Sequence, residues 1–199
     1  MADKRWNLGF ASTVAEQVLE AFRPYCHEVA VAGSVRRRRP WVHDVDLVVY
    51  PKVDEEHAAA QLGLFGGSVT PAPRPAFYRS LEIRRWLPDG LGAWPGVIPL
   101  KVSSIPVEVY LTAYTGCNFG ALLQMRTGPA PLNIILAGRA TFLGLQYRAG
   151  HGVFDANGSR IDSGSEEGVF QALKLQSIPV GRRDGAIRIS DWALPGGRP

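Results

Sequence analysis

The sequence predicts an α+β fold built as one domain or two small ones. Of its 199 residues, 46% are hydrophobic, which is enough for a substantial core. Segments with apolar residues three and four positions apart indicate helices, and alternating or β-branched segments indicate strands. Both patterns occur before and after residue 117, so each part of the chain combines helices with strands.

The first elements are a helix and two strands. Residues 13–22 predict an amphipathic helix, which Ser12 or Thr13 can cap. Residues 28–32 alternate toward a first strand, and the Val-rich residues 44–50 predict a second. We therefore expect this helix to pack on the sheet that the strands form.

The middle of the chain has weaker patterns and one clear strand. Residues 54–64 favour a short helix, and residues 77–86 and 97–102 favour strands joined by a Pro/Gly-rich turn. Residues 105–112 alternate cleanly, which places Glu108, with its even-numbered neighbours, on one face of a strand.

The second part of the chain predicts helices around a small sheet. Asn157-Gly158 is a strong hairpin signal, and Ser165 followed by two glutamates is typical of a helix N-terminus. The expected helices lie at 118–128, 132–140 and 165–173, and the expected strands at 143–145 and 152–155.

Two aspartates are the first candidate functional residues. Asp44 and Asp46 are separated by one residue inside a predicted strand, so both side chains point to the same face, about 7 Å apart. Two carboxylates at that spacing can bridge divalent cations such as Mg²⁺. The pattern therefore indicates a metal site.

A Gly-Ser turn and four arginines precede the aspartates. Gly33 and Ser34 can hold phosphate oxygens through backbone N–H groups and a hydroxyl. The run 36–39 is either a solvated charged turn or a set of phosphate ligands. A metal site beside a phosphate-binding turn points to nucleotidyl transfer.

The order and spacing of these motifs resemble the nucleotidyltransferase superfamily. Gly33 lies eleven positions before Asp44, and the Gly-Ser-x-Arg-Arg form is most similar to the family X DNA polymerases. Thr127-Gly128 followed by Asn133 resembles the thumb of that family, and residues 175–183 resemble its closing motif. The resemblance extends from about residue 5 to residue 183.

The resemblance implies a palm at 1–116, with a mixed or antiparallel sheet and helices on one face, and a small α+β thumb at 117–199. It implies two Mg²⁺ ions, with Mn²⁺ as an alternative, and a template-directed polymerase that fills short gaps in DNA repair. The implied catalytic and metal-binding residues are Asp44, Asp46 and Glu108, and the implied nucleotide-binding residues are Gly33, Ser34, Arg37, Thr127, Gly128 and Asn133.

Some positions depart from the family pattern. Glu108 stands where the polymerases have Asp, and Val42 and His43 replace residues that hold the triphosphate. Met125 and Arg126 replace an aromatic pair that shapes the sugar pocket. A template-independent nucleotidyltransferase and a DNA-binding module with weak or no catalysis are therefore the alternative functions.

The bulk properties suit a polyanionic partner. A net charge of +4 and a pI near 9.3 agree with binding gapped or primed duplex DNA and dNTP. No apolar stretch is long enough to span a bilayer, and the first residues lack a signal-peptide pattern, so we expect a location in the cytoplasm, with the nucleoid or a viral origin as alternatives. We also expect a monomer. The two cysteines match no metal-binding spacing.

Overall fold

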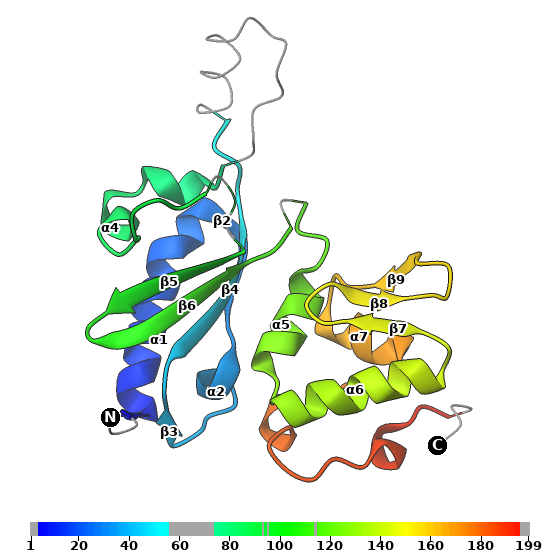
Figure 1. Cartoon of the computed structure of the whole chain (residues 1–199). Coiled ribbons are helices and arrows are strands. Elements are labelled where there is room, and N and C mark those ends of the chain that lie inside the picture. The colour runs from blue at the N-terminus through cyan, green and yellow to red at the C-terminus, as the bar shows by residue number, and fades with distance from the viewer. Residues whose placement is uncertain (1–3, 56–73, 93, 95, 114, 196–199) are drawn as a thin grey trace, which may run out of the picture.

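The N-terminal half is organised around a four-stranded mixed sheet (Figure 1). The computed structural model describes residues 4–55, 74–92, 94, 96–113 and 115–195. The strand order is β2-β4-β6-β5, in which β4 and β6 are parallel and the other two pairs antiparallel. The strands are β2 (Cys26–Val31), β4 (Val45–Pro51), β5 (Val97–Val102) and β6 (Ile105–Leu111).

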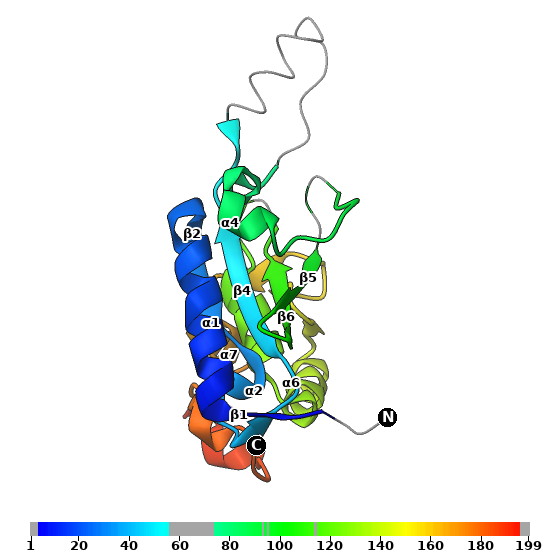
Figure 2. The ribbon, with the colours of Figure 1, turned by 90° about the vertical axis from the view of Figure 1, so that its left-hand side faces the viewer.

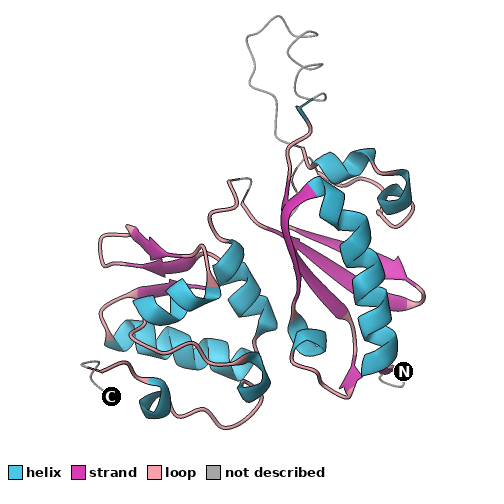
Figure 3. Ribbon diagram, turned by 180° about the vertical axis from the view of Figure 1, so that it is seen from behind, coloured by secondary structure: helices cyan, strands magenta, loops and turns pink. Residues whose placement is uncertain are grey.

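Helix α1 (Leu8–Phe22) covers one face of this sheet (Figures 2 and 3). Its buried side chains pack on alternate residues of β4, among them Leu47 and Val49. The helix begins earlier than predicted, because the Asn7 side chain accepts a hydrogen bond of 2.9 Å from the backbone N–H of Phe10. The predicted cap at Ser12 or Thr13 is therefore wrong.

The strand predicted at 77–86 is also wrong. The chain forms a 3₁₀ turn, η2 (Ala76–Arg79), and a short helix, α4 (Leu81–Arg84). The Ser80 hydroxyl caps α4 by accepting from the N–H of Ile83, and this local bond competes with strand pairing. Phe77 and Ile83 still enter the core beside α1. The helix expected at 54–64 falls largely outside the described residues.

The C-terminal half combines helices with a three-stranded antiparallel sheet of order β7-β8-β9. As predicted, Asn157-Gly158 lies in the turn between β8 and β9, and the Ser165 hydroxyl caps α7 by accepting from the N–H of Gly168. The elements are α5 (Phe119–Thr127), α6 (Ala130–Phe142), β7 (Gln146–Arg148), β8 (Gly152–Phe154), β9 (Arg160–Asp162) and α7 (Glu166–Ala172).

Short elements complete the described chain. They are β1 (Trp6–Asn7) and β3 (Trp41–Val42), which pair antiparallel, α2 (Gly33–Arg36), and the 3₁₀ turns η1 (Arg23–Tyr25), η3 (Val180–Arg182) and η4 (Ile189–Trp192). None of the helices in the described residues is long and apolar enough to cross a membrane.

The two halves meet on the second face of the large sheet. There β4 and β6 contact α5 through a small apolar cluster that consists of Ala32, Val48, Tyr110, Phe119, Leu122 and Leu123. Each half also has a larger apolar cluster of its own, one formed by residues of the N-terminal half and one by residues of the C-terminal half. The predicted division at residues 116 and 117 stays a prediction, because the small cluster spans it. The face toward α5 is the one that carries the candidate site.

Candidate active site

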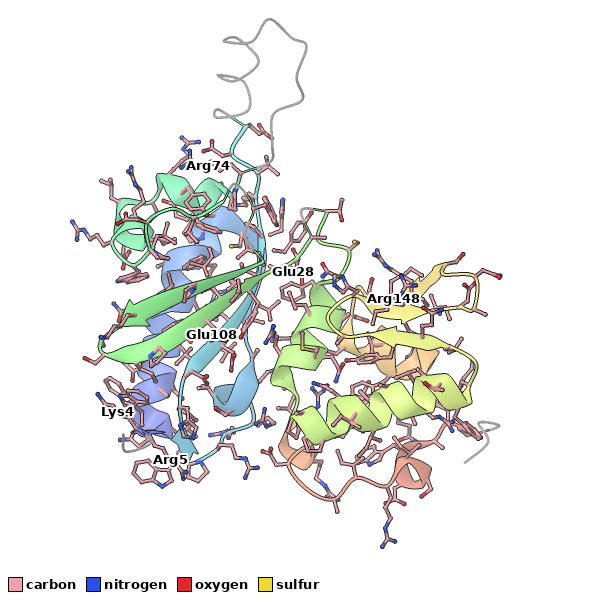
Figure 4. The ribbon with its side chains drawn as sticks, in the orientation of Figure 1. Lys4, Arg5, Glu28, Arg74, Glu108 and Arg148 are labelled. Carbon is pink, nitrogen blue, oxygen red and sulfur yellow. The ribbon has the colours of Figure 1, made fainter. Side chains whose placement is uncertain are left out.

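Asp46 and Glu108 lie side by side on neighbouring parallel strands. They are direct partners in the β4–β6 register, and both share the strand face that packs toward α5 (Figure 4 labels Glu108). Asp44 immediately precedes β4. Burial, with the negative charges of Asp44 and Glu108, raises the pKa of Asp46 to about 7. The fold thus brings the three predicted carboxylates into one electrostatic cluster.

The Gly-Ser turn lies against this carboxylate cluster. A Cβ atom on Gly33 would lie only 1.7 Å from Oδ2 of Asp46, and Gly33 has a positive φ of 60°. The N–H of Ala32 donates to the Asp46 carbonyl at 2.8 Å, which ties the turn to β4. Glycine is therefore required here, and Gly33 and Ser34 begin α2 beside the predicted metal ligand.

Arg126 of α5, which the sequence interpretation placed only at the sugar pocket, also contributes to the carboxylate site. Its guanidinium lies 3.6 Å from the ring centroid of Tyr110, whose hydroxyl donates to Oε2 of Glu108. Burial lowers the pKa of Arg126, and the charges of Asp46 and Glu108 oppose that shift. The Nε of Arg126 is buried without a hydrogen-bond partner among the described residues. Arg126 therefore offsets part of the negative charge.

The three carboxylates are of the ligand type that Mg²⁺ prefers, but in this structure they do not converge on one point. Within the described part of the chain, no three His, Cys, Asp or Glu side chains lie close enough to hold a metal ion. Carboxylate oxygens are the ligands that Mg²⁺ prefers, and a bound cation would oppose both causes of the raised pKa of Asp46, which are burial first and the charges of Asp44 and Glu108 second. In this conformation Glu108 is engaged by Tyr110 instead.

Arg37, predicted to hold phosphate, is engaged by the C-terminal half. Its Nε donates to Oδ1 of Asp184 at 2.8 Å, and its Nη1 donates to the carbonyl of Thr127. Gly128 follows with a positive φ of 55°, and a Cβ atom there would lie 3.8 Å from Nη1 of Arg37. Arg39 reaches the other carboxylate oxygen of Asp184 at 2.9 Å. The fold thus brings Arg37, Thr127 and Gly128 together.

A second ion-pair cluster joins α2 to α7. Arg36 donates to the hydroxyl of Thr127 at 2.7 Å and to Oε2 of Glu166 at 2.5 Å. Arg183 donates to Oε1 of Glu166 at 2.8 Å and to the carbonyl of Ile178 at 3.0 Å. Burial alone would raise the pKa of Glu166, but the two arginines outweigh it and hold the pKa below its ordinary value.

Asn133 connects two helices in this structure. Its Nδ2 donates to the carbonyl of Met125 at 2.9 Å, and its Oδ1 accepts from Nε2 of Gln124 at 3.1 Å. These bonds hold α6 against α5. Contact between Asn133 and a nucleotide base stays a prediction.

Sequence reasoning missed the partners that surround the predicted residues. Tyr110 follows Glu108 by two positions on a strand, so the alternation pattern already placed both on one face. Arg126 and Asp184 come from segments far along the chain, and no local pattern connects them to their partners.

The chain matches no family model and no curated protein in sequence. Its structure is similar to polymerase beta of Leishmania infantum, solved as a ternary P/T complex, with a TM-score of 0.64, 17% identity, and coverage of 92% of this chain and 78% of that chain. The same enzyme in a ternary gap complex gives a TM-score of 0.65 and 16% identity, covering 92% of this chain and 72% of that chain. The protein therefore has a polymerase beta-like α+β fold.

Proposed function

We propose that this protein is a DNA-directed DNA polymerase of the family X type. It would transfer a nucleotidyl group from a dNTP to a primer 3′-hydroxyl and fill short gaps during DNA repair. The observation that carries the proposal is the pairing of Asp46 with Glu108 in register, directly beside the Gly33 turn. The gap complex of the Leishmania enzyme, which has the same fold, supports gapped duplex DNA as a partner.

Each predicted residue has a role that follows from its chemistry. Asp44, Asp46 and Glu108 would hold two Mg²⁺ ions, or Mn²⁺, which supply charge stabilisation at the α-phosphate when bound. Glu108 would also accept the proton of the primer hydroxyl. Arg37 has the forked guanidinium that recognises phosphate oxygens, beside the backbone N–H groups of Gly33 and Ser34.

A DNA-binding module without catalysis is the second candidate function. Two contacts favour it: Glu108 accepts from Tyr110, and Arg37 is occupied by Asp184 and Thr127. A protein that keeps these contacts when it binds DNA would have Glu108 and the Nε of Arg37 occupied by its own residues. The two candidates differ in whether a primer is extended.

The test is extension of a labelled primer across a one-nucleotide gap, with Mg²⁺ or Mn²⁺ and each dNTP and rNTP in turn. We expect incorporation of the nucleotide complementary to the template. Asp46→Asn should abolish incorporation and leave binding to the gapped duplex intact. Asp191→Asn is the matched control, because this carboxylate is exposed and accepts a hydrogen bond from the neighbouring Ser190 hydroxyl.

The outcomes separate the candidates. Incorporation that ignores the template base indicates a template-independent transferase. Tight binding of the gapped duplex with no incorporation under either metal indicates the DNA-binding module. Full incorporation by Asp46→Asn would contradict the assignment of this site.

A further inference from the structure

Asp184 forms an ion pair with the arginine that the proposed function assigns to the triphosphate. Its two carboxylate oxygens contact different arginines: Oδ1 accepts from Nε of Arg37 at 2.8 Å, and Oδ2 lies 2.9 Å from Nε of Arg39. The side chains of Arg37 and Asp184 are 13% and 19% exposed, so the pair is largely shielded from water. One acidic side chain therefore bridges the predicted phosphate-binding turn to the C-terminal segment.

Two of the guanidinium nitrogens of Arg37, Nε and Nη1, are engaged by the chain itself. Nη1 donates to the carbonyl of Thr127, while Nε is held by Asp184. Carboxylate and phosphate oxygens compete for the same N–H groups, because both match the guanidinium fork with charge-assisted hydrogen bonds. A triphosphate that uses the Nε of Arg37 must first displace the carboxylate of Asp184.

The environment of Asp184 allows such a displacement without loss of the surrounding fold. The preceding residue, Arg183, is only 3% exposed and is anchored by Glu166 and the Ile178 carbonyl. The following residue, Gly185, is exposed. The carboxylate therefore lies at the end of an anchored segment, and the ion pairs of Glu166 do not depend on it.

We propose that Asp184 is an internal competitor for the polyphosphate of the nucleotide and sets the affinity of the Arg37 site for it. This inference rests on the proposed function, since it assumes that Arg37 receives a triphosphate. It assigns Asp184 a role that differs from that of Glu166, whose two arginine partners bind it as part of the junction between α2 and α7.

The test measures binding of inorganic tripolyphosphate and of dNTP to the full chain by calorimetry, without DNA. Asp184→Asn should tighten tripolyphosphate binding about tenfold, the usual size of one charge-assisted hydrogen bond. Asp184→Ser provides a second variant that removes the carboxylate. Asp191→Asn removes an equal charge from an exposed position of the same segment and should leave the affinity unchanged.

A double-mutant cycle identifies the group involved. In the Arg37→Gln background, most of the gain from Asp184→Asn should be lost, because only the half-exposed Arg39 is then left to be released. Unchanged or weaker tripolyphosphate binding by both Asp184 variants would overturn the inference, as would an equal gain in Asp191→Asn. The inference is also overturned if none of the variants binds tripolyphosphate.

Primer extension by the same variants separates this inference from the proposed function. A tenfold gain in tripolyphosphate affinity with no extension by the unmodified protein supports competition at Arg37 and contradicts the polymerase assignment. Normal extension without any gain in affinity contradicts only the inference about Asp184.

Discussion

Two charged clusters meet at the junction of the halves, and they are built in opposite ways. The carboxylate cluster, Asp44, Asp46 and Glu108, gathers like charges, and burial together with this repulsion raises the pKa of Asp46 to about 7. The arginine cluster, Arg36, Arg37, Arg39 and Arg183, is paired with Glu166 and Asp184 at distances of 2.5 to 2.9 Å. The carboxylate cluster destabilises the folded state, and the ion pairs of the arginine cluster stabilise it.

From this difference we infer that the carboxylate cluster serves function and the arginine cluster serves structure. Repulsion between buried like charges persists only where the surrounding fold compensates for it, and such sites are typical of catalysis and metal binding. Paired charges at a junction can hold two packed parts together. Arg37 belongs to both descriptions, since it pairs with Asp184 and lies beside the predicted nucleotide site.

The largest effect is expected at Glu108. Glu108→Gln should reduce extension of a gapped primer by at least about 10³-fold, because it would remove the proposed metal ligand and the proposed proton acceptor together. Tyr110→Phe is the matched variant, since it removes only the hydroxyl that donates to Glu108, and it should retain activity within about tenfold. Equal losses in both variants would show that Tyr110 takes part in the chemistry.

The next effect is expected at Glu166, which pairs with two residues of the arginine cluster. Glu166→Gln should lower the free energy of unfolding by about 3 kcal/mol, because it leaves Arg36 and Arg183 without their ionic partner in a largely buried place. Glu167→Gln, at the neighbouring exposed position, should change it by less than about 0.5 kcal/mol. Urea denaturation measures both. Equal stability of the two variants would contradict a structural role for this cluster.

Asp46→Asn should increase the free energy of unfolding, whereas Glu166→Gln should lower it. Because the folded pKa lies near 7 and the ordinary value near 3.8, the folded state retains a proton that the unfolded state has lost between these pH values. Stability therefore falls as pH rises from about 4 to about 7. Asn removes this cost, so the variant should be more stable by roughly 4 kcal/mol at pH 8 and equal to the parent near pH 4.

Thermal unfolding at several pH values checks this prediction in metal-free buffer. A parent protein whose stability relative to Asp46→Asn stays constant from pH 4 to pH 8 would refute the repulsion within the carboxylate cluster. Added Mg²⁺ should stabilise the parent and not the variant, because only the parent retains the full set of ligands.

The smallest effect is expected at Thr127, which is completely buried. Thr127→Val keeps the shape of the side chain and removes the hydroxyl that accepts from Arg36 at 2.7 Å. We expect a loss of about 1 kcal/mol in the free energy of unfolding, with Thr127→Ser as the variant that keeps the hydrogen bond. A larger loss for Ser than for Val would mean that the methyl group, not the hydroxyl, stabilises this turn.

The sequence by itself determined the elements that local pattern controls. The alternation in 105–112 predicted β6, the Val-rich segment predicted β4, and Ser165 predicted the start of α7. These succeeded because side-chain period and capping act over a few residues. The strand predicted at 77–86 was wrong because Ser80 caps a helix there, formed by residues that also suit a strand.

Only the tertiary structure decided how distant residues combine. Parallel pairing of β4 with β6 set Asp46 beside Glu108, and no local signal fixes that register. Packing of α5 and the C-terminal segment then brought Arg126 toward the carboxylates and Asp184 to Arg37. The sequence determined which chemical groups are present. The fold decided which of them repel and which are paired.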